Sequence, residues 1–439
     1  MFNSTLPTVT LSDLLQYADA ITRQAFANEV EYLDILSEDC KNHHHFLSIK
    51  FPKLIHVSID GTDDNSSPDL YQQYLSPTLK IWQFYGGYLS DEFLLQLATS
   101  CPALEEVLID NPRETLTATG FLSFLQSPYL KSLKRLIILY DMETVLSPEV
   151  FANLALHPGL EVLGIRHDEF PSLMSQCSGR PLFPDLKALD LSAPLECLIE
   201  NSQKGHFPTL SRLEVLLKDP SEDFTASFGK QRLIDTTYPG KHAPLAELAA
   251  VFPNLEVLSI EFAEQTVTDI QLEDLAGMSE RFKNLRELRL EGMDGALRGR
   301  DIGDQAVEAL VKKAGKLEIL RLQMTEMGVT DQGLRAVGRE CGSIREVGLG
   351  GRFQLRLQLA GQKGVRFPAL KELELGDVVD TGRGEEDLVR GLMEAAPELK
   401  DFRIEEGESE FASELRKLWR ARREIERQDE DGEGEDRSE

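Results

Sequence analysis

Three segments of the sequence repeat one pattern of apolar residues, and this repetition constrains the fold more than any other feature. Each segment is apolar at its first, fourth and sixth positions, and the three begin at Leu285, Leu317 and Ile344. Apolar residues at the fourth and sixth positions, with a polar or small residue between them, are typical of a short strand with one buried face. Segments with helical character separate the copies. The sequence therefore predicts a stacked array of strand-and-helix units.

The same pattern continues along nearly the whole chain, at intervals of 24 to 32 residues with a single interval of 45. Several units start with Phe-Pro-x-Leu, as at Phe51 and Phe367, and one starts with Cys101-Pro102. Proline cannot extend the preceding helix and favours extended backbone, so this tetrapeptide separates helix from strand. The units begin at Val30, Leu54, Leu79, Leu104, Leu133, Leu160, Leu186, Leu210, Leu255, Leu285, Leu317, Ile344, Leu370 and Leu399.

These units resemble leucine-rich repeats of the ribonuclease-inhibitor-like group, and more closely the cysteine-containing variety found in fungal F-box proteins. The segment from Val329 to Leu334, which reads Val-Thr-Asp-Gln-Gly-Leu and is followed by Cys341, is similar to that family's Thr-Asp-x-Gly-Leu opening. The resemblance implies an α/β fold, a right-handed leucine-rich-repeat solenoid of about 13 or 14 units. A curved parallel sheet is expected on its concave face and helices on its convex face.

The repeats divide the chain into four regions. Residues 1–29 are expected to form a helix that caps the first repeat, with Thr10 and Asp13 at capping-box spacing and an apolar stripe that includes Ile21 and Phe26. This segment also resembles a degenerate F-box. Residues 30–404 hold the repeats, with an insertion near 219–243. Residues 405–428 are expected to form a C-terminal capping helix, and residues 429–439 an acidic, disordered tail.

Composition excludes several classes of function. The net charge of −28 and the pI near 4.8 argue against a general affinity for nucleic acid or anionic membrane. The five cysteines are odd in number and scattered, which suits free thiols in a reducing compartment. No segment approaches the roughly 20 apolar residues that span a bilayer. The sequence predicts an intracellular protein, cytoplasmic, nuclear or both. The cysteines are Cys40, Cys101, Cys177, Cys197 and Cys341.

No motif for catalysis stands out. Cys40 with His43, His44 and His45 is a local cluster of metal-ligand types, and it reads either as a zinc site or as a polar segment after the first strand. The glycines near Gly350 follow a strand but lack the Lys-Ser/Thr pair of a phosphate-binding loop. No nucleophile and base can be paired. We expect a protein that is not an enzyme, with no cofactor and no metal.

The repeat pattern itself predicts a binding surface. If positions one, four and six face the core, positions three, five and seven lie on the exposed face of the sheet. The late repeats place charged residues of both signs there, whereas the early and middle repeats place apolar and aromatic ones, which predicts an interaction site. Two alternatives are a loop that covers the stripe and a choice of residues made by β-propensity alone. The predicted partner-binding residues are Tyr32, Ile81, Tyr85, Leu108, Arg135, Ile137, Leu139 and Val162.

Two hypotheses of function follow. The resemblance to F-box proteins implies a substrate receptor that binds a target on its concave face and joins the ubiquitin-ligase subunits Skp1 and cullin. Such receptors carry an F-box that opens with Leu-Pro, and this chain has Leu6-Pro7 followed by Leu14 and Leu15. The helical segment before Val30 is shorter than a complete F-box. The alternative is a stand-alone scaffold, unconnected to ubiquitin ligases, that binds a protein partner on the same face.

Overall fold

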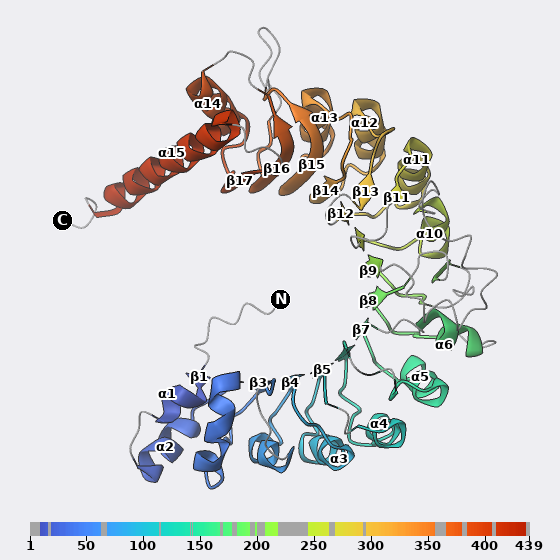
Figure 1. Cartoon of the computed structure of the whole chain (residues 1–439), viewed down its shortest axis with the longest axis vertical. Helices are drawn as coiled ribbons and strands as arrows, with labels where there is room; N and C mark the ends of the chain where they lie inside the picture. The colour runs from blue at the N-terminus through green and yellow to red at the C-terminus, as the bar shows by residue number, and fades with distance from the viewer. Residues whose placement is uncertain are drawn as a thin grey trace. The chain divides into compact units, whose positions relative to one another are not determined.

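The computed structural model describes residues 9–15, 19–62, 68–113, 116–140, 142, 144–166, 170–177, 182–193, 198–199, 207–217, 245–262, 268–292, 296–355, 366–379, 384–405 and 410–435. The chain divides into two compact units, which we describe separately. Unit 1 comprises residues 1–193 and 200–210, and unit 2 comprises residues 194–199 and 211–439 (Figure 1). The predicted insertion near 219–243 lies outside the described residues.

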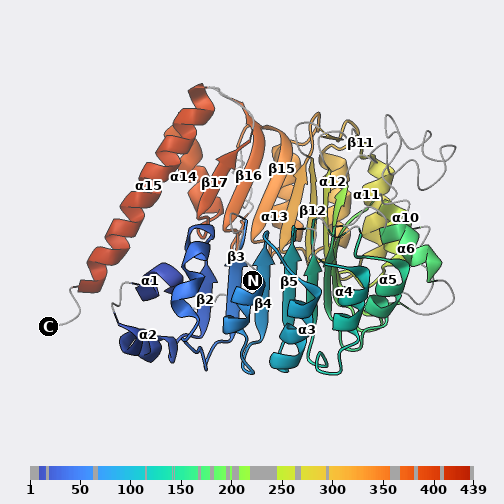
Figure 2. The same ribbon diagram turned by 60° about the horizontal axis from the view of Figure 1, so that its bottom comes forward.

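Unit 1 is built on parallel strands that pair in chain order, and each strand up to residue 165 is followed by a helix or helical turn on the same face of the sheet. Figure 2 shows the early strands of this unit side by side. The helical elements are α1 (Leu11–Leu15), α2 (Ala20–Ala27), η1 (Ser37–Phe46), η2 (Pro68–Tyr74), α3 (Asp91–Ser100), α4 (Ala118–Leu125), α5 (Pro148–Ala155) and α6 (Phe170–Gln176). The strands are β1 (Val9–Thr10), β2 (Tyr32–Ile35), β3 (His56–Asp60), β4 (Ile81–Tyr85), β5 (Glu106–Asp110), β6 (Arg135–Ile138), β7 (Val162–Ile165) and β8 (Ala188–Ser192).

Unit 2 repeats the same plan with longer helices. Its helices are α10 (Leu245–Val251), α11 (Leu272–Arg281), α12 (Asp304–Lys313), α13 (Asp331–Glu340), α14 (Glu385–Ala395) and α15 (Glu410–Glu435). A separate pair of short strands, β11 (Thr268–Asp269) and β13 (Leu297–Arg298), also runs parallel. The main strands are β9 (Arg212–Leu217), β10 (Val257–Phe262), β12 (Glu287–Gly292), β14 (Ile319–Gln323), β15 (Glu346–Phe353), β16 (Glu372–Val378) and β17 (Asp401–Ile404).

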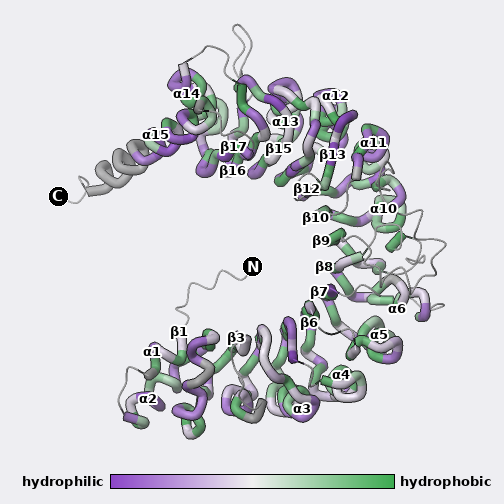
Figure 3. Tube along the Cα trace, in the orientation of Figure 1, coloured by the Kyte–Doolittle hydropathy of each residue, from purple (hydrophilic) through white to green (hydrophobic). Residues whose placement is uncertain are grey.

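The apolar repeat positions form the core in both units, as the sequence predicts. Leu288 on β12, Leu320 on β14 and Val347 on β15 are direct neighbours in the sheet and are at most 1% exposed. Hydrophobic and hydrophilic stretches follow one another along the chain in both units (Figure 3). Parallel strands in register, with helices between many of the successive strands in the described residues, confirm the α/β leucine-rich-repeat fold.

A Thr-x-x-Gly motif explains how successive helices of the array are held. Thr330 caps α13 with its own side chain, and its backbone N–H and hydroxyl donate to Asp304 of the preceding helix at 2.8 and 2.7 Å. Gly333 leaves room for that carboxylate, because a Cβ there would lie 2.9 Å from Asp304 Oδ1. In the same way Thr117, which caps α4, donates its N–H and hydroxyl to Asp91 of the preceding helix α3 at 2.9 and 2.6 Å. Each cap therefore links two repeats.

The N-terminal segment differs from the single capping helix expected for residues 1–29. The capping box is present, since Thr10 N–H donates to Asp13 at 2.9 Å, but α1 ends at Leu15 and Asp19 caps a second helix, α2. This break changes the helical register, so Ile21 and Phe26 are 84% and 45% exposed. The sequence pattern also missed β1, which pairs with β2 and thereby covers an otherwise open sheet edge.

The C-terminal helix α15 covers the last strand, as the apolar stripe predicts. Leu415 and Trp419 are buried, and the Trp419 ring packs edge-on against Phe402 of β17 at 5.9 Å. The Arg423 guanidinium lies 5.3 Å from the Trp419 ring and donates to the carbonyls of Pro397 and Leu399. The helix runs to Glu435, beyond Gln428, where the tail was expected to begin. None of the described helices is long and apolar enough to cross a membrane.

Two cysteines of the repeat signature, Cys101 and Cys341, are buried free thiols. Burial raises the pKa of Cys101 to about 11 and that of Cys341 to about 12. In a variant with Cys40, Cys177 and Cys197 changed to Ser, at most roughly one of the remaining thiols in a thousand is ionised at pH 8, and only the thiolate reacts. We expect Ellman's reagent to react about 100-fold more slowly with this folded protein than with glutathione.

After unfolding in guanidinium, both thiols of that variant should react at the rate of glutathione. A fast reaction of either thiol in the folded protein would contradict its place in the core.

Candidate partner-binding surface

The surface predicted from the sequence lies on the sheet of unit 1, on the side opposite the helices (Figure 1). Along β2 to β5, every second side chain is buried against the helical layer, and the residues between them point away from it. We call the outward set, with its continuation on β6 and β7, the unit 1 face. Its members are Tyr32, Asp34, His56, Ser58, Asp60, Ile81, Gln83, Tyr85, Glu106, Leu108, Asp110, Arg135, Ile137, Val162 and Gly164.

All eight predicted residues lie on this face or at its edge. Tyr32, Ile81, Arg135 and Val162 belong to one row that crosses the strands in register, whereas Leu108 and Ile137 are direct neighbours in the next row. Tyr85 belongs to a third row. Leu139 follows β6, where its N–H donates to the carbonyl of Ile109 at 3.0 Å. These side chains are half-buried, apart from Leu108, which is only 8% exposed.

The apolar stripe is not continuous, because polar residues that the sequence analysis left out share its rows. His56 lies between Tyr32 and Ile81, and Glu106 lies between Ile81 and Arg135. The alternation within each strand identifies these polar residues too as outward-facing. The omitted residues on β2 to β5 are Asp34, His56, Ser58, Asp60, Gln83, Glu106 and Asp110.

Tyr85 is the aromatic centre of the acidic part of the face. In the register of the sheet it stands between Asp60 on β3 and Asp110 on β5. Its hydroxyl donates to Gln83 Oε1 at 3.4 Å, and the Gln83 amide donates to Glu106 at 3.1 Å. Burial raises the pKa of the Tyr85 phenol, and the negative charges of Asp110, Glu106 and Asp34 raise it further. The phenol therefore stays neutral in a strongly negative field.

Arginines lie at the β6 side of the face and just beyond the end of β5, where Arg113 donates to the Thr62 carbonyl at 2.6 Å. Arg135 on β6 lies 3.6 Å from the buried carboxylate of Glu106. Arg166, just after β7, donates to the Tyr140 hydroxyl at 3.0 Å and lies 5.9 Å from its ring. Burial raises the pKa of Asp34, and the nearby His56 opposes that shift. The outward residues of β2 to β5 thus include four carboxylates and no lysine or arginine.

The corresponding face of unit 2 carries a network of ion pairs. Arg289 donates two hydrogen bonds to Glu346, at 3.1 and 3.0 Å. Arg321 also contacts Glu346 and reaches Glu374 on β16 at 3.2 Å. It reaches that far because Gly348 lies between them, where a Cβ would be 3.1 Å from Arg321 Cγ. The mixed-charge region predicted for the late repeats is therefore largely internally paired.

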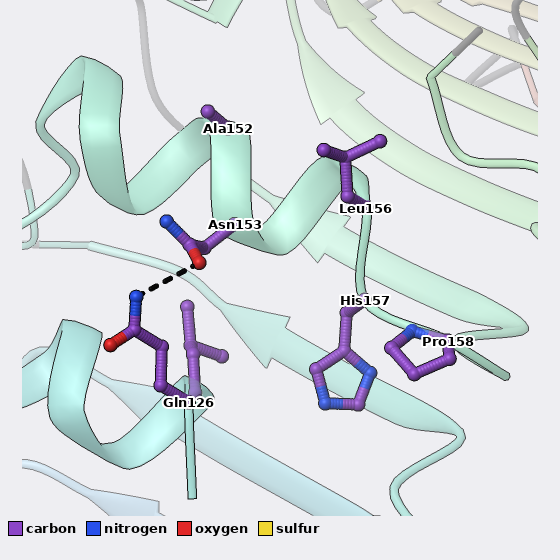
Figure 4. Close-up of a pocket in the computed structure, with 7 residues that line it drawn as sticks. Gln126, Ala152, Asn153, Leu156, His157 and Pro158 are labelled. Carbon is purple, nitrogen blue, oxygen red and sulfur yellow. Dashed lines mark hydrogen bonds between the residues drawn. The ribbon is translucent and has the colours of Figure 1, made fainter.

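A cavity of about 400 Å³ lies on the helical side of unit 1, between the C-terminal ends of α4 and α5 (Figure 4). Gln126 and Asn153 cross it, and their side-chain amides hydrogen-bond to each other at 3.1 Å. Burial lowers the pKa of His157, so its imidazole is neutral at pH 7. The two side-chain amides of this cavity thus pair with each other, and its apolar lining continues onto the exposed Leu156.

The histidine cluster of the first repeat does not converge on one point. His43 is fully buried, and its Nδ1 is 2.8 Å from the Tyr74 hydroxyl, whereas His44 and His45 are exposed. The side chain of Cys40 lies outside the described part. Among the described residues, no group of three metal-ligating side chains is close enough to hold an ion.

The comparisons with known proteins identify no family for the chain. No protein-family model matches it, and no curated protein matches its sequence. Among solved structures, the chain is similar to one in the crystal structure of the Rad7 and Elc1 complex in yeast. The identity is 17%, the match covers 90% of this chain and 85% of that chain, and the TM-score is 0.46. The fold assignment above rests on the strand register and the repeats.

Proposed function

We propose that this protein is a non-enzymatic interaction module that binds a protein partner on the unit 1 face. The observation that supports this proposal is a sheet face, opposite the helices, on which half-buried apolar and aromatic side chains lie beside charged ones. Ile81 and Ile137 lie in adjacent rows, so a partner could bury both at once. Interfaces of this kind combine an apolar centre with a polar surround.

Loss of these two side chains should remove the partner. We expect an Ile81→Ser/Ile137→Ser variant to lose proteins that co-purify with the wild type, because truncating central apolar anchors costs about 1 to 2 kcal/mol each in binding. Quantitative mass spectrometry of affinity-purified full-length protein would measure this loss, with circular dichroism to show that the variant is folded. Serine adds no charge to the face.

A matched control exists on the helical side of the same unit. Leu95 and Leu156 are 49% and 43% exposed, and Leu156 also lines the cavity between α4 and α5. A Leu95→Ser/Leu156→Ser variant should keep every partner of the wild type. If this control loses the partner and the face variant retains it, the partner binds the helical side and the proposal is wrong.

The link to a ubiquitin ligase is a separate part of the proposal. Leu11 and Leu14 on α1, from the segment that resembles an F-box, are buried, and α1 packs against β1, β2 and η1. This use of the apolar side chains favours a stand-alone scaffold over a receptor that docks on Skp1. We therefore expect Skp1 and cullin to be absent from the affinity-purified full-length protein. Their stoichiometric recovery, retained in the Ile81→Ser/Ile137→Ser variant, would support the receptor instead.

A further inference from the structure

The cavity of about 400 Å³ between α4 and α5 has the composition of a site for a small molecule (Figure 4). Two of its seven lining residues are the amides that pair with each other, and a third is His157. Ligand pockets combine a mainly apolar wall with a few polar groups that orient the ligand. The four remaining residues are apolar: Leu125, Ala152, Leu156 and Pro158.

His157 occupies a position that most repeats fill with an apolar side chain. This position lies three residues before the first apolar residue of each unit, and it includes Phe51, Phe183 and Phe367, which are at most 3% exposed. Ser76 is also polar there, but its hydroxyl lies 2.5 Å from the hydroxyl of Thr78. His157 therefore places a polar ring in a layer that is otherwise apolar.

The imidazole of His157 is buried and incompletely hydrogen-bonded. The residue is only 9% exposed, and its Nδ1 has no hydrogen-bond partner among the described residues. Burial lowers the pKa of the imidazole, and the nearby Pro158 backbone opposes that shift. A buried polar ring without full hydrogen bonding is unfavourable, so a bound molecule that offers it a hydrogen bond is favoured.

The charges around the cavity favour an uncharged ligand. None of the seven lining residues is charged. The C-terminal end of a helix carries partial negative charge, which disfavours an anion between the ends of α4 and α5. A cation would be buried there without a counter-charge. A hydroxyl group suits the neutral imidazole, because it can either donate or accept a hydrogen bond.

The volume of the cavity sets the size of the ligand. An apolar cavity of roughly 150 Å³ holds benzene, so a cavity of about 400 Å³ holds a molecule with about two rings. The lining continues onto Leu156, which is 43% exposed, so a ligand can enter from the surface of the helical layer.

We propose that the cavity between α4 and α5 binds a small uncharged molecule of about two rings, with one hydroxyl group that hydrogen-bonds to His157. This site lies on the helical side of unit 1, apart from the unit 1 face, so the inference does not depend on the proposed function. The Ile81→Ser/Ile137→Ser variant should bind the same molecule as the wild type does.

2-Naphthol, which has two fused rings and one hydroxyl group, is the probe for this inference. Its fluorescence, titrated with the full-length protein, should give a Kd below about 1 mM. Ala152→Phe adds a ring to the wall of the cavity and should raise this Kd at least tenfold. A matched control, Thr99→Phe, adds the same ring at an exposed position on α3 and should leave Kd within twofold.

A second probe isolates the hydrogen bond to His157. 2-Methylnaphthalene has nearly the shape of 2-naphthol but no hydrogen-bonding group. The ratio of its Kd to that of 2-naphthol should fall at least fivefold in His157→Phe, which introduces the side chain that several other repeats have there. Comparing ratios removes the difference in hydrophobicity between the probes.

Three results would overturn the inference. The first is a wild-type protein that does not bind 2-naphthol at about 1 mM. The second is an equal Kd for the wild type and a folded Ala152→Phe variant, which would place the probe elsewhere. The third is an unchanged Kd ratio in His157→Phe, which would show that the hydroxyl group does not contact the imidazole. Thermal denaturation followed by circular dichroism shows that each variant is folded.

Discussion

Leu320→Asn should destabilise unit 2 by about 3 to 8 kcal/mol. Leu320 is fully buried on β14 and is paired in register with Leu288 and Val347. Truncating a buried leucine costs about 2 to 5 kcal/mol, and an amide without a partner in the core adds about 1 to 3 kcal/mol. The sum of these two costs approaches the total free energy of unfolding of many domains. Because each repeat packs mainly on its neighbours, the loss should extend to the adjacent repeats.

Urea denaturation followed by circular dichroism would measure this loss, and hydrogen exchange would locate it on β12, β14 and β15. Ile319→Asn is a matched control, because Ile319 precedes Leu320 on the same strand but faces the exposed side. The control should lower the free energy of unfolding by less than about 1.5 kcal/mol, since a half-exposed amide keeps its hydrogen bonds to water. Equal losses for the two variants would contradict the assignment of the buried face, which is the basis of the whole fold.

Arg321→Met should destabilise unit 2 by about 2 to 4 kcal/mol. The Arg321 side chain is only 14% exposed, and it contacts Glu346, Glu374, Glu372 and Glu291. Glu346 and Glu374 are themselves 13% and 17% exposed. Without Arg321, Glu346 keeps its hydrogen bonds to Arg289, but Glu374 loses the arginine that it contacts, and breaking a buried ion pair costs about 3 to 5 kcal/mol when burial is complete. The remaining exposure lowers the expected value.

Arg352→Met provides the matched control for this prediction. Arg352 is 75% exposed and pairs with Asp377 at 3.2 Å, so its removal should cost less than about 1 kcal/mol. High salt should abolish the effect of Arg352→Met but not that of Arg321→Met, because buried charges are screened less. Adding Glu374→Gln to Arg321→Met should recover part of the lost stability. A double-mutant cycle with no coupling between the two positions would contradict the network.

Much of the fold follows from local sequence. The alternation at Leu288 and Leu290, repeated at each unit, identifies the strands and their buried face, and the Phe-Pro lead-ins locate the helix-to-strand boundaries. The N-terminal segment shows where this reasoning fails. Asp19 starts a new helix and leaves Ile21 and Phe26 exposed, because a local capping interaction outweighs an apolar period. The pairing of β1 depends on backbone hydrogen bonds to β2, which apolar patterning does not encode.

The candidate partner-binding surface could likewise be predicted from the sequence only in part. Alternation determines which residues face outward, so Tyr32, Ile81, Tyr85 and Ile137 could be placed on the exposed face from the sequence. The same alternation places His56 and Glu106 on this face, but only the structure shows that they stand in one row with Tyr32 and Ile81. The Thr-x-x-Gly motif at Thr117 and Thr330 was a usable signal for links between helices, and its glycine marks the space that the preceding aspartate needs.

The sequence by itself determined the repeat, the α/β class, the core residues and the outward residues, because alternation within a strand is a local property of extended backbone. Only the tertiary structure decided which outward residues are neighbours. Tyr85 stands between Asp60 and Asp110, and Arg321 reaches Glu374 across Gly348, over 53 residues of sequence. Such contacts depend on the lateral register of parallel strands, which is set by helices and loops of unequal length packing between them.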